Sequence, residues 1–260
     1  MLWNEPHSWL YYLLLLALGG GVLASLPIGT LFFFKRSGVK RANIFLGLLL
    51  LAIGFTLLHN ILYITSFYEH YPQFKFFPIY FTLAFPSLLF FYVKLNLFPA
   101  YRMRFTDLKH FILPLFQWLF FWWIFLQPTD EKYRLDRMFY NPFYGGLEQA
   151  LYLFAFFAYL YFAYRYLLAS RHTPASFEQQ RQRWYLRKLI KGLFVLFGIH
   201  AVFVLTDFFC YEFLYLNLRS VKVYAGLGAL SFAALVYFLA AYGFQVLFWG
   251  RKLFGAHRRW

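Results

Sequence analysis

The sequence contains few charged residues and a single cysteine. Only 13% of its 260 residues are charged, whereas 62% are hydrophobic and 26% are aromatic. A soluble domain has about a quarter charged and about half apolar residues. The one cysteine, Cys210, excludes a disulfide framework and a multi-cysteine metal site within one chain. This composition excludes an ordinary soluble domain and indicates a membrane protein.

Signatures of common enzyme classes are also missing from the sequence. It has no HExxH, no GxSxG, no glycine-rich phosphate-binding loop and no histidine cluster with metal-ligand spacing. Neither a low-complexity tract nor an internal repeat of about 20 to 50 residues occurs. We therefore expect no enzymatic activity, no cofactor and no metal ion.

Long apolar runs make up most of the chain. A helix needs about 20 apolar residues to cross a hydrocarbon core of about 30 Å, so the chain has room for several crossings joined by short loops. The runs predict an all-α, seven-helix transmembrane bundle that forms a single domain over residues 1–260. Pro86, near the middle of the third run, predicts a kink there. The predicted spans are 9–34, 44–67, 79–97, 110–126, 147–168, 192–216 and 223–249.

Lysine and arginine are distributed unevenly between the loops. Seven spans place the two termini on opposite sides of the membrane, and basic loops stay on the cytoplasmic side. Nineteen of the 25 basic residues fall on the side of the C-terminus and six on the other side. This predicts an outer N-terminus and a cytoplasmic C-terminus in the cytoplasmic (inner) membrane. Because the net charge of +15 comes from such loops, we expect no direct nucleic-acid binding.

An aspartate interrupts the sixth apolar run. Asp207 lies in "GIHAVFVLTDFFCYEF", nine residues before Leu216. A carboxylate at membrane depth costs at least about 2.5 to 3.5 kcal/mol, so such groups usually face the bundle interior and have a partner. His59 and Asn60 lie at a similar depth in the second run. We expect His59 and Asp207 to form a pair.

Glu148, at the outer start of the fifth run, and Tyr211 extend this candidate site. The functional interpretation is a polar cavity, open to the outside, that binds a small molecule or ion. The structural interpretation is a set of interhelical hydrogen bonds, each worth about 0.6 kcal/mol. A proton or ion relay is a third interpretation, although the inner halves of the runs have almost no titratable groups. The candidate ligand-binding residues are His59, Asn60, Glu148, Asp207 and Tyr211.

A basic segment, "SFEQQRQRWYLRKLIKG" at 176–192, precedes the sixth run. Ser176 followed by Gln179 is typical of a helix capping box. The expected helix separates aromatic from basic side chains, a pattern typical of helices at anionic membrane surfaces. Docking of a cytoplasmic protein partner is the alternative. The residues expected to contact that partner are Arg181, Arg183, Trp184, Arg187 and Lys188.

A series of motifs runs through residues 57–114: Tyr71-Pro72, Pro78, Pro86, "FFYVK" at 90–94 and "DLKHFILP" at 107–114. In this order they resemble the N-terminal membrane domain of AraC-type transcriptional regulators of Bacteroidetes. The later "RWYLRKLIKGLFVLF" resembles the segment that leads into that family's penultimate spans. The resemblance implies a sensor module. That family continues into a cytoplasmic helix-turn-helix domain, whereas this sequence ends eleven residues after Trp249, so we expect another chain to supply the output.

The sequence therefore predicts a sensory or signal-relay module that binds a small ligand in its outer half and acts through a cytoplasmic partner. A channel or transporter is the first alternative, and it requires a continuous polar path. A membrane anchor or scaffold for a partner protein is the second. The lipid bilayer surrounds the chain in all three cases, and the sequence leaves oligomerisation open.

Overall fold

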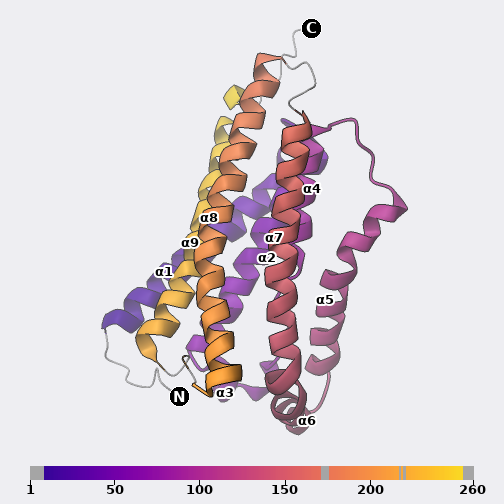
Figure 1. Cartoon of the computed structure of the whole chain (residues 1–260). Helices are drawn as coiled ribbons and strands as arrows, with labels where there is room; N and C mark the ends of the chain where they lie inside the picture. Colours follow the sequence, from indigo (N-terminus) through magenta and orange to yellow (C-terminus); the bar gives the residue numbers. More distant parts are fainter. Residues whose placement is uncertain (1–8, 171–175, 217, 219–220, 254–260) are drawn as a thin grey trace.

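The computed structural model describes residues 9–170, 176–216, 218 and 221–253, and within them the chain forms helices joined by turns (Figure 1). The predicted all-α class is confirmed. The elements are α1 (Trp9–Phe34), α2 (Lys40–Ile64), α3 (Phe67–His70), η1 (Pro72–Phe74), α4 (Ala84–Leu97), η2 (Phe105–Phe111), α5 (Ile112–Phe125), α6 (Thr129–Leu135), η3 (Asp136–Tyr144), α7 (Gly145–Ala169), α8 (Phe177–Leu214) and α9 (Lys222–Leu253). Of the three elements labelled η, η1 and η2 are 3-10 helices and η3 is a π-helix.

Six helices among the described residues are long and apolar enough to cross a membrane. They match all the predicted spans except the third. Large apolar side chains point outwards from them, such as Leu16 and Phe154 at 78% and 76% exposure. Such a surface fits a lipid environment and supports a multi-pass membrane protein. The apolar segments are Tyr11–Phe34, Lys40–Ile64, Phe105–Phe125, Gly145–Ala169, Gln179–Tyr211 and Gly226–Phe248.

The structure departs from the prediction at the third span, 79–97. Its helix, α4, begins only at Ala84 and has 14 residues, which gives a length of about 21 Å. That is shorter than a bilayer core of about 30 Å. The predicted kink at Pro86 is wrong, because this proline lies in the first turn of α4, where the missing N–H costs no helical hydrogen bond.

The other helices enclose α4. Its residues Phe85 to Leu95 are all buried. It packs along α2 and α7 and also contacts α8 and η2. Because it is covered by protein on its sides, α4 does not need the full length of a lipid-facing span.

Residues 75–83, which lead into α4, are largely non-helical. Irregular backbone at membrane depth is tolerated where protein covers it and satisfies its polar groups. Here the Phe81 N–H donates to Thr56 Oγ1 at 3.0 Å, and the Leu83 N–H donates to Gln117 Oε1 at 3.1 Å. Polar side chains on α2 and α5 therefore support this segment.

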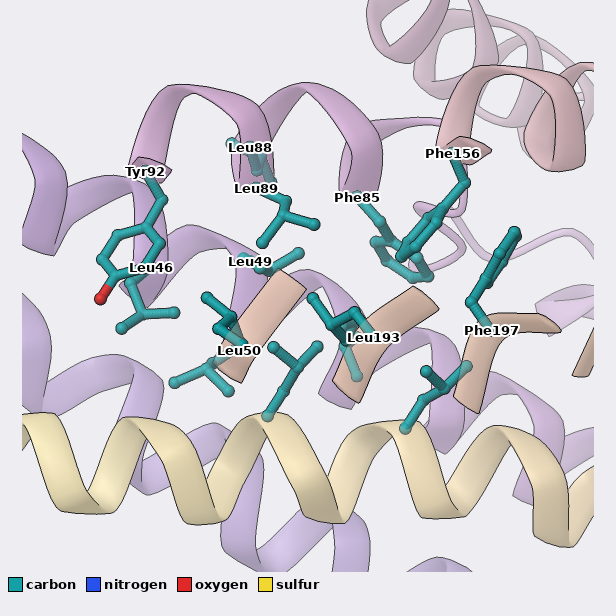
Figure 2. Close-up of a cluster of buried hydrophobic side chains, with 14 of the residues drawn as sticks. Leu46, Leu49, Leu50, Phe85, Leu88, Leu89, Tyr92, Phe156, Leu193 and Phe197 are labelled. Carbon is teal, nitrogen blue, oxygen red and sulfur yellow. The ribbon is translucent and has the colours of Figure 1, made fainter. Parts of the chain in front are cut away.

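Six helices pack in a closed ring. Helix α2 packs on α1 and α4, α7 packs on α4 and α8, and α9 packs on α8 and α1. Leucine and aromatic side chains fill the interior, including Leu50 of α2, Leu89 of α4 and Phe197 of α8 (Figure 2). Helix α5 stands at the edge of the bundle (Figure 1) and contacts mainly η2 and α6.

The two ends of the bundle have different characters. We call the end formed by residues 65–80 and 127–144 the cap; it contains α3, η1, α6 and η3. We call the opposite end, where α4, α7 and α9 finish and α8 begins, the basic end (Figure 1). The basic segment 176–192 consists of the N-cap residue Ser176 and the first part of α8, a single helix of 38 residues and about 57 Å. It continues the axis of the sixth span and is not a separate surface helix.

The predicted capping box at the start of α8 is confirmed. Ser176 Oγ accepts a hydrogen bond from the Gln179 N–H at 3.3 Å, and Gln179 Oε1 accepts one from the Ser176 N–H at 3.0 Å. The two residues satisfy each other's backbone donors and so define where this long helix begins.

Candidate functional site

A cluster of buried polar side chains lies where α5, α7 and the segment before α4 meet. Glu148, in the first turn of α7, is 4% exposed. Its Oε1 accepts hydrogen bonds from Gln117 Nε2 of α5 and from Thr82 Oγ1, the latter at 3.4 Å. Gln117 Nε2 also donates to Thr82 Oγ1 at 2.9 Å. We call Thr82, Gln117 and Glu148 the Glu148 cluster.

The second carboxylate oxygen of Glu148 is not satisfied. Oε2 is buried and has no hydrogen-bond partner among the described residues. The hydroxyl of Tyr152, one turn further along α7, is also buried and lacks a partner within the described part of the chain. Leaving a buried polar group without a partner costs about 1 to 3 kcal/mol, and more when it is charged. Glu148 and Tyr152 thus place two polar atoms one turn apart on α7 where an additional hydrogen-bond partner would be favourable.

Two tyrosines of η3, Tyr140 and Tyr144, interact electrostatically with Glu148. Burial raises the pKa of Tyr140 and of Tyr144, and the nearby Glu148 carboxylate adds to both shifts. Tyr80, from the segment before α4, acts in the same direction on both residues. The ring of Tyr144 stacks on Phe120, with centroids 3.8 Å apart. The phenolic groups of Tyr140 and Tyr144 therefore lie within electrostatic range of Glu148.

The backbone that precedes Glu148 is a π-helix. Such helices are rare and are frequently found at functional sites. Here η3 spans Asp136–Tyr144 and runs directly into α7. It carries Tyr140 and Tyr144 into the surroundings of Glu148, so an unusual backbone helps to build this site.

Two lysines hold the cap together. Lys75 Nζ lies 2.5 Å from Asp136 Oδ2 and 4.3 Å from the centroid of the Tyr133 ring. Lys132 Nζ donates to the Gln73 carbonyl at 2.7 Å. Burial lowers the pKa of Lys132. These contacts join residues 72–75 to α6 and η3, and both lysine ammonium groups are engaged with cap residues.

Phe76 adopts a left-handed backbone conformation, with φ of 63°. This region is uncommon for residues other than glycine. Its side chain is 6% exposed and packs against Phe121 and Tyr140, at centroid distances of 6.0 and 5.1 Å. Packing of this ring therefore holds the strained turn that leads towards Tyr80 and Thr82.

The predicted pair of His59 and Asp207 does not form. His59 Nδ1 is hydrogen-bonded to the Tyr68 hydroxyl at 2.9 Å, and its ring contacts those of Tyr68 and Tyr80. Burial raises the pKa of Tyr68. Helix α2 packs with α1, α4 and α9, whereas α8 packs with α7 and α9. Equal depth along two helices did not make them neighbours.

Asp207 is buried at 8% exposure on α8, next to Tyr224 of α9. The Tyr224 hydroxyl donates to the Phe203 carbonyl at 2.6 Å. Asp207 and Tyr224 lie within electrostatic range of each other. The expectation that Asp207 faces protein is met, on the α8–α9 side and apart from the Glu148 cluster.

The remaining two predicted ligand-binding residues lie in different surroundings. Asn60 is half-buried on α2, next to His59. Tyr211 is 52% exposed on α8. Of the five candidates, Glu148 is the residue whose surroundings most resemble a binding site, and His59 is connected to them through Tyr80.

The basic residues predicted to contact a partner lie along the first turns of α8. Arg181 and Lys188 are exposed, and Arg183 and Arg187 are half-buried. Lys188 Nζ lies 3.6 Å from the centroid of the Trp184 ring, a cation–π contact on an exposed face. On the inner face of the same segment, Gln182 Nε2 donates to Asn96 Oδ1 of α4 at 2.9 Å and anchors the segment to α4.

Sequence reasoning missed two members of the Glu148 cluster, Thr82 and Gln117. Gln117 is a polar side chain within the apolar run 110–126, and a polar residue inside a span is itself a signal of a partner or a site. Thr82 gave no comparable signal, because threonine is common in membrane helices and the segment before α4 was expected to be helical.

Neither metal-ligand geometry nor comparison with other proteins points to a further site or to a family. Within the described residues, no group of three or more His, Cys, Asp or Glu side chains is placed to hold a metal ion. No protein-family model matches the chain, and comparisons with curated proteins and with solved structures give no match either.

Proposed function

We propose that this protein is a sensor of the cytoplasmic (inner) membrane, which binds a small ligand beside Glu148 and relays a conformational change to its basic end. In this proposal α4 and the segment before it form a seventh crossing, the N-terminus and the cap face outwards, and the basic end is cytoplasmic. The observation that carries the proposal is Glu148 Oε2, a buried carboxylate oxygen without a partner among the described residues. Ionisable groups inside a membrane mark functional sites by default.

The charge distribution supports the proposed orientation. By sequence, nineteen of the 25 lysines and arginines fall in segments that the proposed orientation assigns to the cytoplasmic side. Short cytoplasmic loops carry such an excess. The cap then faces the outside, and a ligand reaches the Glu148 cluster from there.

Helix α4 supplies a physical connection between the two ends. Thr82, just before it, contacts Glu148, and Asn96 near its end binds Gln182 of α8 at 2.9 Å. A ligand shifts a conformational equilibrium only through different affinities for two states. A ligand that displaces Thr82 from Glu148 changes the position of α4, and Asn96 transmits that change to the basic segment.

The apolar interior between the ends favours a sensor over a channel. Between the Glu148 cluster and the basic end, the helices are packed with side chains such as Phe85, Leu89 and Leu193 (Figure 2), all at most 1% exposed. A conducting path needs polar groups or water through the full thickness of the bilayer. This core separates the polar groups near the cap from the basic end.

The resemblance to the membrane domain of AraC-type regulators supports the same proposal. Two of the motifs that carry it meet in space, since Lys94 of "FFYVK" lies 3.7 Å from Asp107 of "DLKHFILP". In this proposal the output comes from a separate cytoplasmic protein that docks on the exposed side of the basic segment. Its contact residues are Arg181, Arg183, Trp184, Arg187 and Lys188.

The proposal is tested with a fluorophore on Arg181→Cys in a Cys210→Ser background, reconstituted in liposomes. Small amines, carboxylates and sugars at millimolar concentration are added outside. We expect at least one class to change the fluorescence, with no accompanying ion flux. The response should persist in Glu131→Gln, a cap variant that removes a charge paired with Arg134, and disappear in Glu148→Gln. Ligand-dependent ion flux, or a reporter that responds to none of these compounds, would overturn the sensor.

A further inference from the structure

We infer that the ligand of the Glu148 cluster carries an ammonium group, which binds between Glu148 Oε2 and the hydroxyl of Tyr152. This inference rests on the proposed function and names the chemical class of its ligand. It starts from what the two atoms lack: both are buried and neither has a hydrogen-bond partner in the described part of the chain. They lie four residues apart on α7, so they share a helix face and are separated by one turn.

The charge of the site favours a cation. Glu148 receives hydrogen bonds from two neutral groups, the amide of Gln117 and the hydroxyl of Thr82. The lysines of the cap are held elsewhere, with Lys75 on Asp136 and Lys132 on the Gln73 carbonyl. An ionised carboxylate in such a setting is stabilised by a partner of opposite charge.

The aromatic surroundings favour an organic ammonium ion over a metal ion. Ring faces attract ammonium groups, and cages of tyrosine and tryptophan are the usual sites for them. Tyr140 and Tyr144 lie within the electrostatic reach of Glu148. A metal ion would instead need several carboxylate or imidazole ligands, and the described residues provide no such group.

An ammonium group also matches the hydrogen-bonding capacity of the site. It has three donors and no acceptor, and Glu148 Oε2 and the Tyr152 oxygen can each accept. The rest of the ligand then extends past the rings of Tyr80 and Tyr144 towards the cap. The structure thus assigns a small primary amine with an apolar or aromatic body.

The test compares three molecules of the same shape: phenethylamine, 2-phenylethanol and phenylacetate. Unfolding of the full-length protein in nanodiscs is followed by tryptophan fluorescence while each is titrated. We expect only the amine to raise the midpoint in a saturable way, as a ligand selective for the folded state does. In Glu148→Gln the affinity for the amine should fall by about 30-fold or more, the effect of removing one partner of a buried charge pair. Glu131→Gln should bind as the wild type does.

Tyr152→Phe keeps the inference testable if Glu148→Gln fails to fold. Because its hydroxyl has no partner, the variant should be at least as stable as the wild type without ligand, yet bind the amine several-fold more weakly. Equal shifts with 2-phenylethanol, an unchanged affinity in Tyr152→Phe, or no saturable shift with the amine would overturn the ammonium site. A fluorescence response at residue 181 to a carboxylate or sugar, with no amine binding, would leave the sensor standing and remove only this inference. Amine binding with no fluorescence response at residue 181 would remove the sensor and leave the ammonium site standing.

Discussion

Lys94 and Asp107 form a buried ion pair that joins α4 to η2, the 3-10 helix that precedes α5. Lys94 Nζ lies 3.7 Å from Asp107 Oδ1, and both side chains are at most 10% exposed. Asp107 also accepts hydrogen bonds from the Tyr101 hydroxyl at 2.7 Å and from the Arg104 N–H at 2.8 Å. The ring of Tyr101 lies 3.8 Å from the lysine ammonium group. The Asp107 carboxylate is therefore held by an ion pair and by hydrogen bonds, and Tyr101 contacts both members of the pair.

Asp107→Ala should destabilise the protein by about 3 kcal/mol, because it leaves a lysine buried without its counter-charge. Lys94→Met should cost less, since Asp107 keeps Tyr101 and the Arg104 N–H as partners. Unfolding in mixed detergent micelles measures both changes. A double-mutant cycle should give a coupling energy of about 1 kcal/mol. Strictly additive effects of the two substitutions would mean that the pair does not contribute as a pair.

Helices α1 and α2 approach each other closely at Gly29 and Gly47. A Cβ on Gly47 would lie 2.8 Å from the Gly29 carbonyl oxygen, and a Cβ on Gly29 would lie 3.0 Å from that of Gly47. Small residues allow such backbone contact in membrane bundles. Gly47→Ala should therefore lower the unfolding midpoint, because the obstacle is backbone that cannot rotate away.

Gly198→Ala is the matched control for that substitution. Gly198 also lies within a helix, and a Cβ there meets nothing within 4 Å. Alanine is favoured over glycine in helices by about 1 kcal/mol, so this variant should be as stable as the wild type or slightly more stable. Equal destabilisation by the two substitutions would show that the contact between α1 and α2 is not the cause.

Several elements could be predicted from the sequence because they depend on local properties. Length and hydrophobicity were enough for the long helices, and the Ser176–Gln179 spacing was enough for the start of α8. The lead-in to α4 could not be predicted in this way, since its irregular backbone depends on protein cover and on acceptors from α2 and α5. The pairing of His59 with Asp207 failed for a related reason: depth along a helix does not determine which helices are neighbours. Glu148 was found because it lies at the outer start of the predicted fifth run, on the same side as the other candidates, whereas its partnership with Gln117 required the fold.

Ser176 caps the helix that carries the basic segment. Ser176→Ala removes the acceptor for the Gln179 N–H and should cost about 1 kcal/mol. The loss is expected to be local, so amide hydrogen exchange over 177–182 should speed up more than exchange in the apolar part of α8. Ser176→Asp, which keeps an acceptor at this position, should retain slow exchange. If both variants exchange like the wild type, capping does not control this helix end.

The stability of the protein should rise with pH above about 8 because of Lys35. This residue follows α1, and its Nζ donates to the Val246 carbonyl of α9 at 2.6 Å. Burial lowers the pKa of Lys35 from 10.5 to about 8. Below about 8 the ammonium group is charged in both the folded and the unfolded state, so the folded state carries the full cost of its burial. Between about 8 and 10.5 the folded protein releases the proton while the unfolded chain still holds it, and the free energy of unfolding increases with pH in this window.

The measurement is the unfolding midpoint at a series of pH values between 7 and 10.5, the upper limit being the ordinary pKa of lysine. In the wild type the midpoint should carry an upward contribution across the upper part of this range. Lys35→Gln cannot titrate and should lose that contribution, while its side-chain amide can still donate to a nearby carbonyl. Lys40→Gln, at an exposed lysine five residues further along, should keep the pH dependence of the wild type. Identical profiles for Lys35→Gln and the wild type would show that Lys35 is not the group responsible, because no other substitution separates the two proteins.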